Sequence, residues 1–323
     1  VFGGLYGAII VEDDEEIPVD RERVMVVSDI TLDSGGSLVS PSTMERMMGR
    51  EGELVLVNGA AKPDLKGRSG ERERWRIINA CTARYLALRL PEQRARVVGR
   101  DVGRLPRDMA LEDVVLAPGN RLDLVVDLSE GGSELIAMPV DRGGMMGQMM
   151  GGGPRPGGGG PVTLARLSVS ASGNRAVGEI PAGTAVRDLR DADVDGRRSI
   201  TFQMGMGGMM GGGDGPMSFT FDGEEFDADR IDQQVGMDTV EEWTIGNDSP
   251  MDHPFHLHVW PMQLLEVDGQ QLSEPVWLDV VNVPARSQVK VRVAFEDFGG
   301  RTVYHCHILD HEDRGMMGTV LAS

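Results

Sequence analysis

All six histidines of the 323-residue chain fall in two short segments. The segments contain, in order, His253, His256 and His258, and His305, His307 and His311. A single histidine is usually an ordinary core or surface residue, but neutral imidazole is also the commonest side-chain ligand for metals. Because every histidine is gathered in these two segments, the sequence predicts metal binding.

The spacing within each segment suits β-strands. Successive side chains of a strand point to opposite faces, so residues two apart share a face. His256 and His258 then lie on one face, and so do His305 and His307. If the two strands are neighbours, four imidazoles converge on one side of the sheet.

Cys306 lies between two of these histidines and must point to the opposite face. There it can meet His253, His311 and the thioether of Met316 around a separate ion. A thiolate, two imidazoles and a weak thioether form the ligand set of a blue-copper electron-transfer site, and soft sulfur donors disfavour calcium, magnesium and manganese. Zinc is the main competitor, but structural zinc sites more typically use closely spaced cysteine pairs, and this chain has only two cysteines.

The two segments resemble the C-terminal copper motifs of the multicopper oxidases. The motifs are His-x-x-His-x-His, starting at His253, and His-Cys-His-x-x-x-His-x-x-x-x-Met, starting at His305. The resemblance implies a type 1 copper held by His253, Cys306, His311 and axial Met316, a type 2 copper on His256, and a type 3 copper pair on His258, His305 and His307. It further implies that substrate electrons enter at type 1 and pass through Cys306 to a trinuclear cluster that reduces oxygen to water.

Other stretches extend the resemblance over most of the chain. Residues 116–127 resemble a recurrent stretch of the family's middle domain, and residues 4–8 resemble the last strand of its first domain. The resemblance implies tandem cupredoxin-like Greek-key β-sandwiches of the bacterial three-domain type. Cys81 matches no ligand position, and we expect a buried free thiol there.

The chain itself predicts an all-β protein. Its apolar stretches are short, rich in valine and isoleucine, and separated by turn residues. Expected strands include residues 8–11, 24–30, 53–57, 74–78, 122–126, 289–295 and 302–307. Composition and the resemblance together place the domain boundaries at 1–16 (a remnant of a first domain), 17–175 (a second domain), 176–195 (a linker) and 196–323 (a third domain with the copper ligands).

One feature departs from the family. The trinuclear cluster also requires two His-x-His pairs from the first domain, whereas this chain has no histidine before His253. We therefore expect an N-terminal segment of about one domain, roughly 100 residues or more, or a separate chain, to supply them. The oxidase activity would depend on those histidines.

Glu312 is the candidate catalytic residue. Oxygen reduction consumes protons, so a buried cluster needs a carboxylic acid within reach. Glu312 follows His311 directly, and in similar bacterial members a glutamate at this position serves proton delivery. The alternative is a surface acid or a hydrogen bond that orders the loop.

The methionines bear on the electron donor. Half of the twenty lie in two glycine-rich segments, 138–160 and 204–217, which we expect to be loops. Thioethers select Cu(I), so the chain resembles the cuprous oxidases, and Met251 is a candidate Cu(I) ligand beside His253. The alternatives are a glycine–methionine linker and a laccase-like oxidase, whose phenolic donor would meet the exposed edge of a type 1 histidine.

Composition excludes several partners. With 51 acidic and 32 basic residues the formal charge is −19, which repels nucleic acid and anionic membranes. No apolar run approaches the length of a membrane span. Periplasmic or extracellular localisation is implied by the resemblance alone, and no oligomeric state is indicated. A truncated copper-binding or electron-transfer protein with a working type 1 site remains the alternative to an oxidase.

Overall fold

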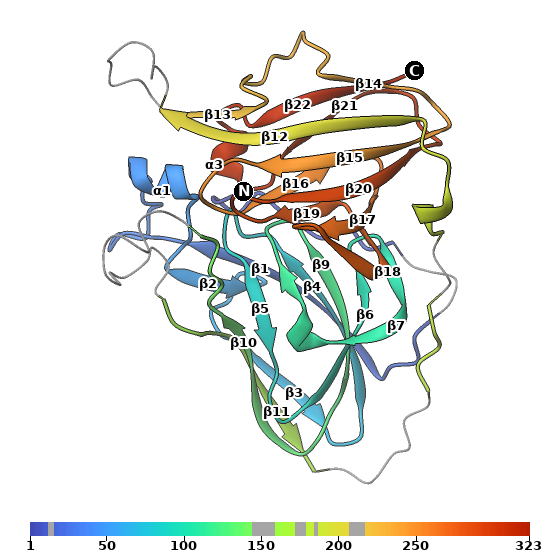
Figure 1. The fold of residues 1–323 in the computed structure, drawn as a ribbon. Helices are drawn as coiled ribbons and strands as arrows, with labels where there is room; N and C mark the ends of the chain where they lie inside the picture. The colour runs from blue at the N-terminus through green and yellow to red at the C-terminus, as the bar shows by residue number, and fades with distance from the viewer. Residues whose placement is uncertain (12–15, 144–158, 172–178, 184–186, 207–216) are drawn as a thin grey trace. The chain divides into compact units, whose positions relative to one another are not determined.

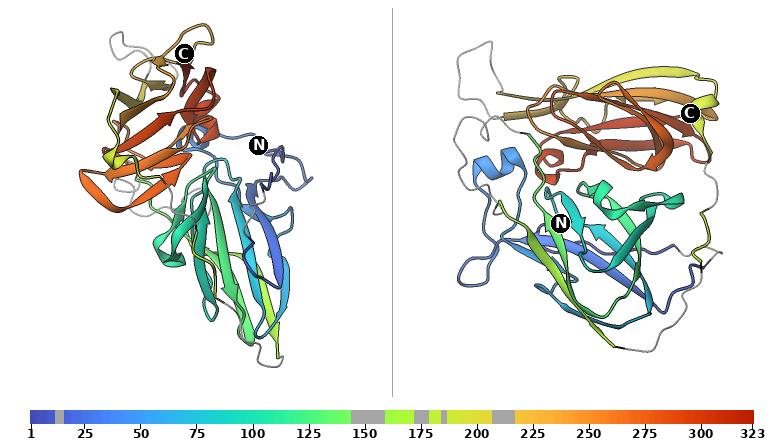
Figure 2. Two further views of the ribbon diagram at one scale, coloured as in Figure 1. Left: turned by 90° about the vertical axis from the view of Figure 1, so that its right-hand side faces the viewer. Right: turned by 60° about the horizontal axis from the view of Figure 1, so that its bottom comes forward.

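The computed structural model describes residues 1–11, 16–143, 159–171, 179–183, 187–206 and 217–323 (Figure 1). The chain divides into two compact units. One consists of the described parts of residues 1–41, 50–140 and 154–185, and the other of the described parts of 42–49, 141–153 and 186–323. Each unit is a two-layered β-sandwich, and we call them the first and the second sandwich (Figures 1 and 2). The all-β, cupredoxin-type prediction is confirmed.

The first sandwich has a six-stranded and a five-stranded sheet. The six-stranded sheet has the order β2 (Leu54–Val57), β1 (Arg21–Ile30), β4 (Arg72–Asn79), β9 (Arg121–Asp127), β6 (Arg94–Arg100) and β7 (Gly103–Ala110). The five-stranded sheet has the order β3 (Asp64–Arg68), β11 (Val162–Ser170), β10 (Gly131–Met138), β5 (Leu86–Arg89) and β8 (Val115–Leu116). A short 3₁₀ helix, η1 (Leu111–Asp113), precedes β8.

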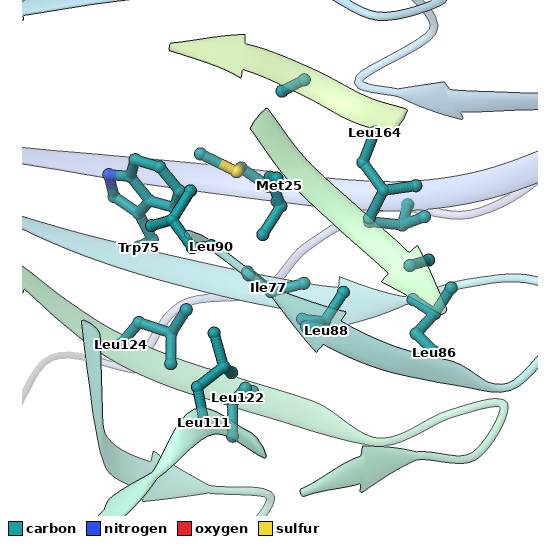
Figure 3. Packing of buried hydrophobic residues seen from close by; sticks show 14 of the residues in the cluster. Met25, Trp75, Ile77, Leu86, Leu88, Leu90, Leu111, Leu122, Leu124 and Leu164 are labelled. Carbon is teal, nitrogen blue, oxygen red and sulfur yellow. The ribbon is translucent and has the colours of Figure 1, made fainter. Parts of the chain in front are cut away.

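Alternating apolar residues fill the space between these two sheets. Trp75 and Ile77 on β4 are fully buried, as are Leu122 and Leu124 on β9 and Leu86 on β5 (Figure 3). Because strand side chains alternate between faces, residues two apart supply one layer of the core. The burial of this layer is the main stabilisation of the sandwich.

The second sandwich repeats this arrangement. Its six-stranded sheet has the order β13 (Met217–Phe221), β12 (Gly196–Met206), β15 (Thr239–Asn247), β20 (Gln288–Phe295), β17 (Met262–Val267) and β18 (Gln270–Leu278). Its five-stranded sheet has the order β14 (Gln233–Val235), β22 (Met317–Ala322), β21 (Gly300–Cys306), β16 (His253–Leu257) and β19 (Val280–Val283). Helix α3 (Leu309–Glu312) connects β21 to β22.

Helix α1 (Thr43–Met48) comes early in the chain but belongs to the second unit. A capping box begins the helix: the Ser42 hydroxyl accepts from the backbone N–H of Glu45, and the Glu45 carboxylate accepts from the backbone N–H of Ser42. Gly49 ends it with a φ of 77°, which glycine adopts at little cost. The residue pattern of this segment did not predict a helix.

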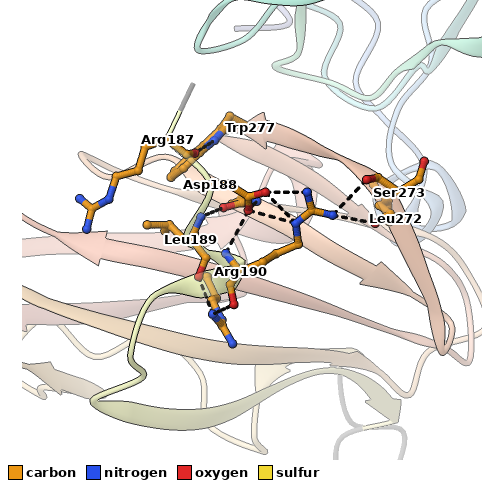
Figure 4. A network of polar contacts seen from close by, with 9 residues as sticks. Arg187, Asp188, Leu189, Arg190, Leu272, Ser273 and Trp277 are labelled. Carbon is orange, nitrogen blue, oxygen red and sulfur yellow. Dashed lines mark hydrogen bonds and ion pairs between the residues drawn. The ribbon is translucent and has the colours of Figure 1, made fainter. Parts of the chain in front are cut away.

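The segment expected to be a linker has an ordered end in the second unit. The 3₁₀ helix η2 (Leu189–Asp191) buries Leu189 completely. Gln263 accepts from the N–H of Leu189 and donates to Asp188, whose carboxylate also accepts from Arg190 (Figure 4). Residues 187–191 therefore pack as part of the second sandwich.

Most of the expected strands form. Six of the seven coincide with β1, β2, β4, β9, β20 and β21, although β21 ends at Cys306. The prediction of a strand at residues 8–11 is wrong, because Ile9 is 93% exposed and the stretch pairs with no strand in the described part of the chain. No helix among the described residues is long and apolar enough to cross a membrane.

The two methionine-rich segments were expected to be loops, and their ends differ from this prediction. Met138 ends β10, and Met206 at the end of β12 pairs with Met217 at the start of β13. The ladder hydrogen bonds of these sheets extend into the segments. Met145, Met146, Met149, Met150, Met209 and Met210 lie outside the described residues.

Candidate metal centre

Strands β16 and β21 are antiparallel neighbours at the centre of the site. Phe255 lies opposite Cys306, and His256 lies opposite His305. Because facing residues of an antiparallel pair point to the same side, Cys306 shares a face with Phe255, while His305 shares the opposite face with His256. The alternation predicted from sequence thus separates two groups of ligand-type side chains.

The thiolate cluster consists of His253, Cys306 and His311. The Nδ1 atom of His253 lies 3.3 Å from the Sγ atom of Cys306 and 3.3 Å from the Nδ1 atom of His311. Cys306 Sγ and His311 Nδ1 are 3.7 Å apart. One sulfur and two nitrogens therefore converge on a single point, and all three side chains are fully buried.

The outer nitrogens of both imidazoles in this cluster have protein partners. His253 Nε2 lies 2.8 Å from the hydroxyl of Ser249, and His311 Nε2 lies 3.1 Å from the carbonyl oxygen of Met47 on α1. A carbonyl can only accept, so His311 donates from Nε2 and presents Nδ1 as a lone pair. Such partners fix the tautomer and the ring orientation of metal-binding histidines.

Two aromatic rings stack on the same two imidazoles and fix their orientation. His253 stacks on Phe202 with ring centroids 5.0 Å apart, and His311 stacks on Phe219 at 4.6 Å. Phe202 and Phe219 are themselves fully buried on β12 and β13. The six-stranded sheet therefore supports ligands that the five-stranded sheet and α3 supply.

Met316 lies beside the thiolate cluster. Its backbone N–H donates to the carbonyl of His311 at 3.1 Å, and its carbonyl accepts from the N–H of Cys306 at 3.0 Å. Its side chain is fully buried. The backbone of the expected axial ligand is thus joined to two of the clustered residues.

Burial sets the protonation of these groups in the metal-free protein. It lowers the pKa of His253 well below its usual value and that of His311 to about 3, and it raises the pKa of the Cys306 thiol. A dry site with two neutral imidazoles and one sulfur suits a soft cation, because the cation's charge stabilises the thiolate that burial disfavours. The donor set therefore fits copper.

The histidine cluster lies on the other face of β16 and β21. Ligand nitrogens of His256, His258 and His305 all lie within 4.8 Å of one another, and the Nε2 atoms of His258 and His305 are 3.1 Å apart. The ring of His307 lies 5.5 Å from that of His256 and 5.6 Å from that of His305, centroid to centroid. The four imidazoles expected to converge are brought together.

Backbone carbonyls orient two of these imidazoles. His256 Nδ1 donates to Asp279 O at 2.7 Å, and His305 Nδ1 donates to Cys306 O at 2.9 Å, so the lone pair of each ring lies on Nε2. His307 Nδ1 is a buried nitrogen without a hydrogen-bond partner in the described part of the chain. Burial lowers the pKa of His256 to about 4 and that of His307 to about 3. Neutral imidazoles with unused nitrogens are what a metal requires.

Glu312 lies on α3 beside the histidine cluster. Its Oε2 atom is 3.6 Å from Nδ1 of His305, and the side chain is half-buried. Burial, and then the charge of Asp313, raises the pKa of the Glu312 carboxyl. The expected proton donor therefore lies within one water molecule's reach of a cluster histidine.

Met251 is less accessible to solvent than a residue that binds Cu(I) from solution should be. Its side chain is only 1% exposed, and its carbonyl accepts from the side chains of Asn247 and Ser249. As a Cu(I) ligand it would serve an ion that has already entered the protein.

The expectation of an exposed type 1 histidine edge is not met by this site. Both outer nitrogens are hydrogen-bonded, and both rings are fully buried. The sequence analysis also missed the partners themselves. The carbonyls of Met47 and Asp279 leave no signature in a sequence, whereas Ser249, four residues before His253, was visible but had no spacing rule to mark it.

Comparisons with known proteins agree with this geometry. The sequence model of a family described as multicopper oxidase matches residues 194–323. The chain is 28% identical to the multicopper oxidase mco of Staphylococcus aureus over 99% of its own length and 64% of that protein's. It is also 28% identical to the cell division protein FtsP of Dickeya dadantii, over 100% and 67% of the two lengths.

A solved structure shows the same likeness. The multicopper oxidase of Campylobacter jejuni, described as a metallo-oxidase, superposes with a TM-score of 0.78 at 30% identity. The match covers 94% of this chain and 64% of that one. The chain thus spans about two thirds of the length of the relatives it matches.

Proposed function

We propose that this chain, which belongs to the multicopper oxidase family, carries the part of an oxidase that accepts electrons from the donor. Single electrons from a donor, Cu(I) in our proposal, enter at the thiolate cluster. They pass to the histidine cluster, where oxygen is reduced to water.

The observation that carries this proposal is the direct connection of the two clusters. Cys306 contributes its sulfur to one cluster, and its carbonyl accepts a hydrogen bond of 2.9 Å from His305 of the other. One residue therefore joins the two groups through covalent bonds and one hydrogen bond. A zinc site would have no use for such a connection, because zinc is not redox-active.

Copper is the cofactor that the donor sets fit. In our assignment His253, Cys306, His311 and Met316 would hold a type 1 copper, His256 a type 2 copper, and His258, His305 and His307 a type 3 pair. Copper bound there supplies one-electron redox couples.

The chain's own residues exclude water, orient the ligand side chains and supply a proton. The buried rings of Phe202 and Phe219 exclude water from the thiolate cluster. The outer partners of His253 and His311 keep their Nδ1 lone pairs pointing inward. In our proposal, Glu312 holds a proton at Oε2 and releases it towards the histidine cluster.

Complete oxygen reduction requires more imidazoles than the histidine cluster offers. We place them on histidines outside the 323 residues, either elsewhere on a longer chain or on a partner chain. The four-electron activity is therefore a property of that complete assembly.

Two alternatives remain distinct from a cuprous oxidase. A laccase-like enzyme would need access for a phenol, and the hydrogen-bonded histidine edges argue against direct contact. A copper-binding or electron-transfer protein would use the thiolate cluster alone, and the similarity to FtsP keeps a role other than oxidation open.

The test is an anaerobic titration with Cu(I) of the complete copper-loaded assembly, including the histidines outside these 323 residues, followed by admission of oxygen. We expect the blue absorption to bleach with Cu(I) and to return with oxygen uptake. Bleaching by Cu(I) without recovery in oxygen would favour the electron-transfer alternative. Reduction by phenols but not by Cu(I) would favour the laccase-like one.

A further inference from the structure

Arg142 belongs to the second unit and is anchored beside the thiolate cluster. Its carbonyl oxygen accepts from the N–H of Asp252 at 2.8 Å, and Asp252 directly precedes His253. The next residue, Gly143, forms an antiparallel bridge with Met251. The backbone of Arg142 is therefore attached to the stretch that supplies the first ligand of the cluster.

Gly143 makes this close approach possible. Its φ is 73°, in the left-handed region that favours glycine. A Cβ atom there would lie 2.7 Å from the carbonyl oxygen of Pro250 and 3.2 Å from the Cβ of Ala285. Any larger residue would push the two segments apart, so the backbone itself fixes the place of Arg142.

The guanidinium of Arg142 extends to the helix that orients another ligand. Its Nη2 atom donates to the carbonyl of Met48 on α1 at 3.4 Å, and its Nη1 atom is buried. The preceding carbonyl of α1, that of Met47, accepts from Nε2 of His311 at 3.1 Å. One arginine thus joins the segment beside His253 to the helix that holds His311.

The charge of Arg142 acts on all three ligands of the thiolate cluster. Burial is the main cause of the low pKa values of His253 and His311, and the charge of Arg142 lowers both further. Burial raises the pKa of the Cys306 thiol, and Arg142 opposes that rise. Arg314 acts on His311 but on neither of the other two. Arg142 is therefore a positive charge that the whole cluster shares.

The carboxylates that neighbour Arg142 and His253 along the chain, Asp141 and Asp252, do not offset this charge. Neither contributes to the pKa shifts of the three ligands. Asp141 is exposed, so water and ions screen it. The carboxylate of Asp252 accepts from the side-chain amide of Asn282 on β19 at 2.9 Å. The buried side of the guanidinium, by contrast, lies where charges are screened least.

We propose that Arg142 tunes the thiolate cluster: its fixed, partly buried charge raises the reduction potential there and so favours electron transfer from the donor. The proposal rests on the function above, in which this cluster accepts single electrons. In that step the donor loses one electron and the centre gains it, and no bond is made or broken. The reduced centre has one positive charge fewer than the oxidised centre, so a nearby cation stabilises it by comparison.

The test is a redox titration of the blue absorption in the copper-loaded protein and its variants. Arg142→Gln and Arg142→Met remove the charge, whereas Arg142→Lys keeps the charge without the planar guanidinium. Arg197→Gln is the matched control, because it removes the same charge from an arginine on β12 whose side chain is 70% exposed.

We expect both neutral variants of Arg142 to stay blue and to lower the equilibrium constant for one-electron reduction by about tenfold, which is a fall of about 59 mV in potential. Arg142→Lys should recover most of this loss. The control should leave the potential nearly unchanged, since solvent screens an exposed charge.

An unchanged potential in the neutral variants would overturn the proposal, and so would an equal shift in Arg142→Lys and Arg142→Gln, because charge would then not be the cause. Loss of copper from both neutral variants would also overturn it, since the arginine would then hold the site together rather than tune it. Absence of blue absorption in the unaltered protein would instead contradict the ligand assignment on which the proposal rests.

Discussion

The first and second sandwiches connect their strands in the same order, yet among the residues that the structure describes only those of the second form a ligand set. Each has a six-stranded sheet facing a five-stranded one, with equivalent strands in equivalent places. Both also bury a tryptophan whose Nε1–H donates to a glutamate two residues earlier: Trp75 to Glu73 at 2.8 Å and Trp243 to Glu241 at 2.9 Å.

Two buried asparagines, one in each sandwich, show which positions of the first sandwich correspond to the metal ligands of the second. The side chain of Asn79 donates to the carbonyl of Leu116, and that of Asn247 donates to the carbonyl of Val283. Leu86 pairs with Leu116, and His253 pairs with Val283. By this register, fully buried Leu86 stands in the first sandwich where His253 stands in the second.

The same comparison assigns a counterpart to the cysteine. Ala137 lies opposite Leu88, as Cys306 lies opposite Phe255, and Leu88 and Phe255 follow Leu86 and His253 by two residues. In both sandwiches, therefore, the side chains at these positions lie buried between the two sheets. In the first sandwich they are apolar, whereas in the second His253 and Cys306 provide nitrogen and sulfur.

The largest expected effect comes from removing that sulfur. Cys306→Ser should abolish the blue absorption and turnover together, because a hydroxyl cannot replace the soft thiolate of a type 1 site. Cys81→Ser, in the first sandwich, is the control and should change neither. Visible absorption and oxygen uptake measure both variants, and a Cys306→Ser protein that stayed blue would refute the ligand assignment.

Glu312→Gln should act only on the second half of the reaction. Loss of an ionisable proton donor should slow reoxidation by oxygen on the order of 100-fold, while reduction of the type 1 centre stays near normal. Stopped-flow absorption separates the two steps in protein that reduces oxygen. Glu274→Gln, at an exposed glutamate on β18, is the control. An unchanged reoxidation rate would leave Glu312 with a structural role.

The ligand set should also make the copper-free second sandwich sensitive to acid. The unfolded chain protonates His256 and His307 near pH 6.5, but in the folded protein their pKa values are about 4 and about 3. The unfolded state thus binds more protons between these limits, so the free energy of unfolding should fall as the pH is lowered from about 6.5 towards 4.

Each such imidazole contributes on the order of 1–3 kcal/mol to this loss. Denaturant titrations of the copper-free protein at several pH values measure it, and a His256→Gln variant should lose less stability with acid. A flat pH profile over this range would show that the imidazoles are not buried as described.

The smallest effect should come from the axial position. Met316→Leu should preserve the blue colour and raise the reduction potential of the type 1 centre, because the thioether forms a long, weak bond that tunes the metal rather than holding it. Redox titration of the visible absorption gives the potential. Met262→Leu, at another fully buried methionine of this sandwich, is the control. Loss of copper from Met316→Leu would contradict the axial assignment.

The features of the site that were predicted correctly from the sequence are those that depend on the spacing of residues along one strand. The alternation of β16 and β21 separated the sulfur face from the histidine face, because a strand fixes the direction of each side chain. It did not predict contacts between distant segments that involve the backbone. The carbonyl of Met47 meets His311 across 264 residues of sequence, and no residue type marks it. The stretch 8–11 had a strand-like composition, but strands also need partners, which composition does not show.

The most direct test of the account is anomalous diffraction at the copper absorption edge from a crystal of the copper-loaded protein. We predict a copper peak between Nδ1 of His253, Nδ1 of His311 and Sγ of Cys306, and none beside Leu86 and Ala137 in the first sandwich. A peak at the thiolate cluster that appears only at the zinc edge, or no metal there at all, would contradict the central claim.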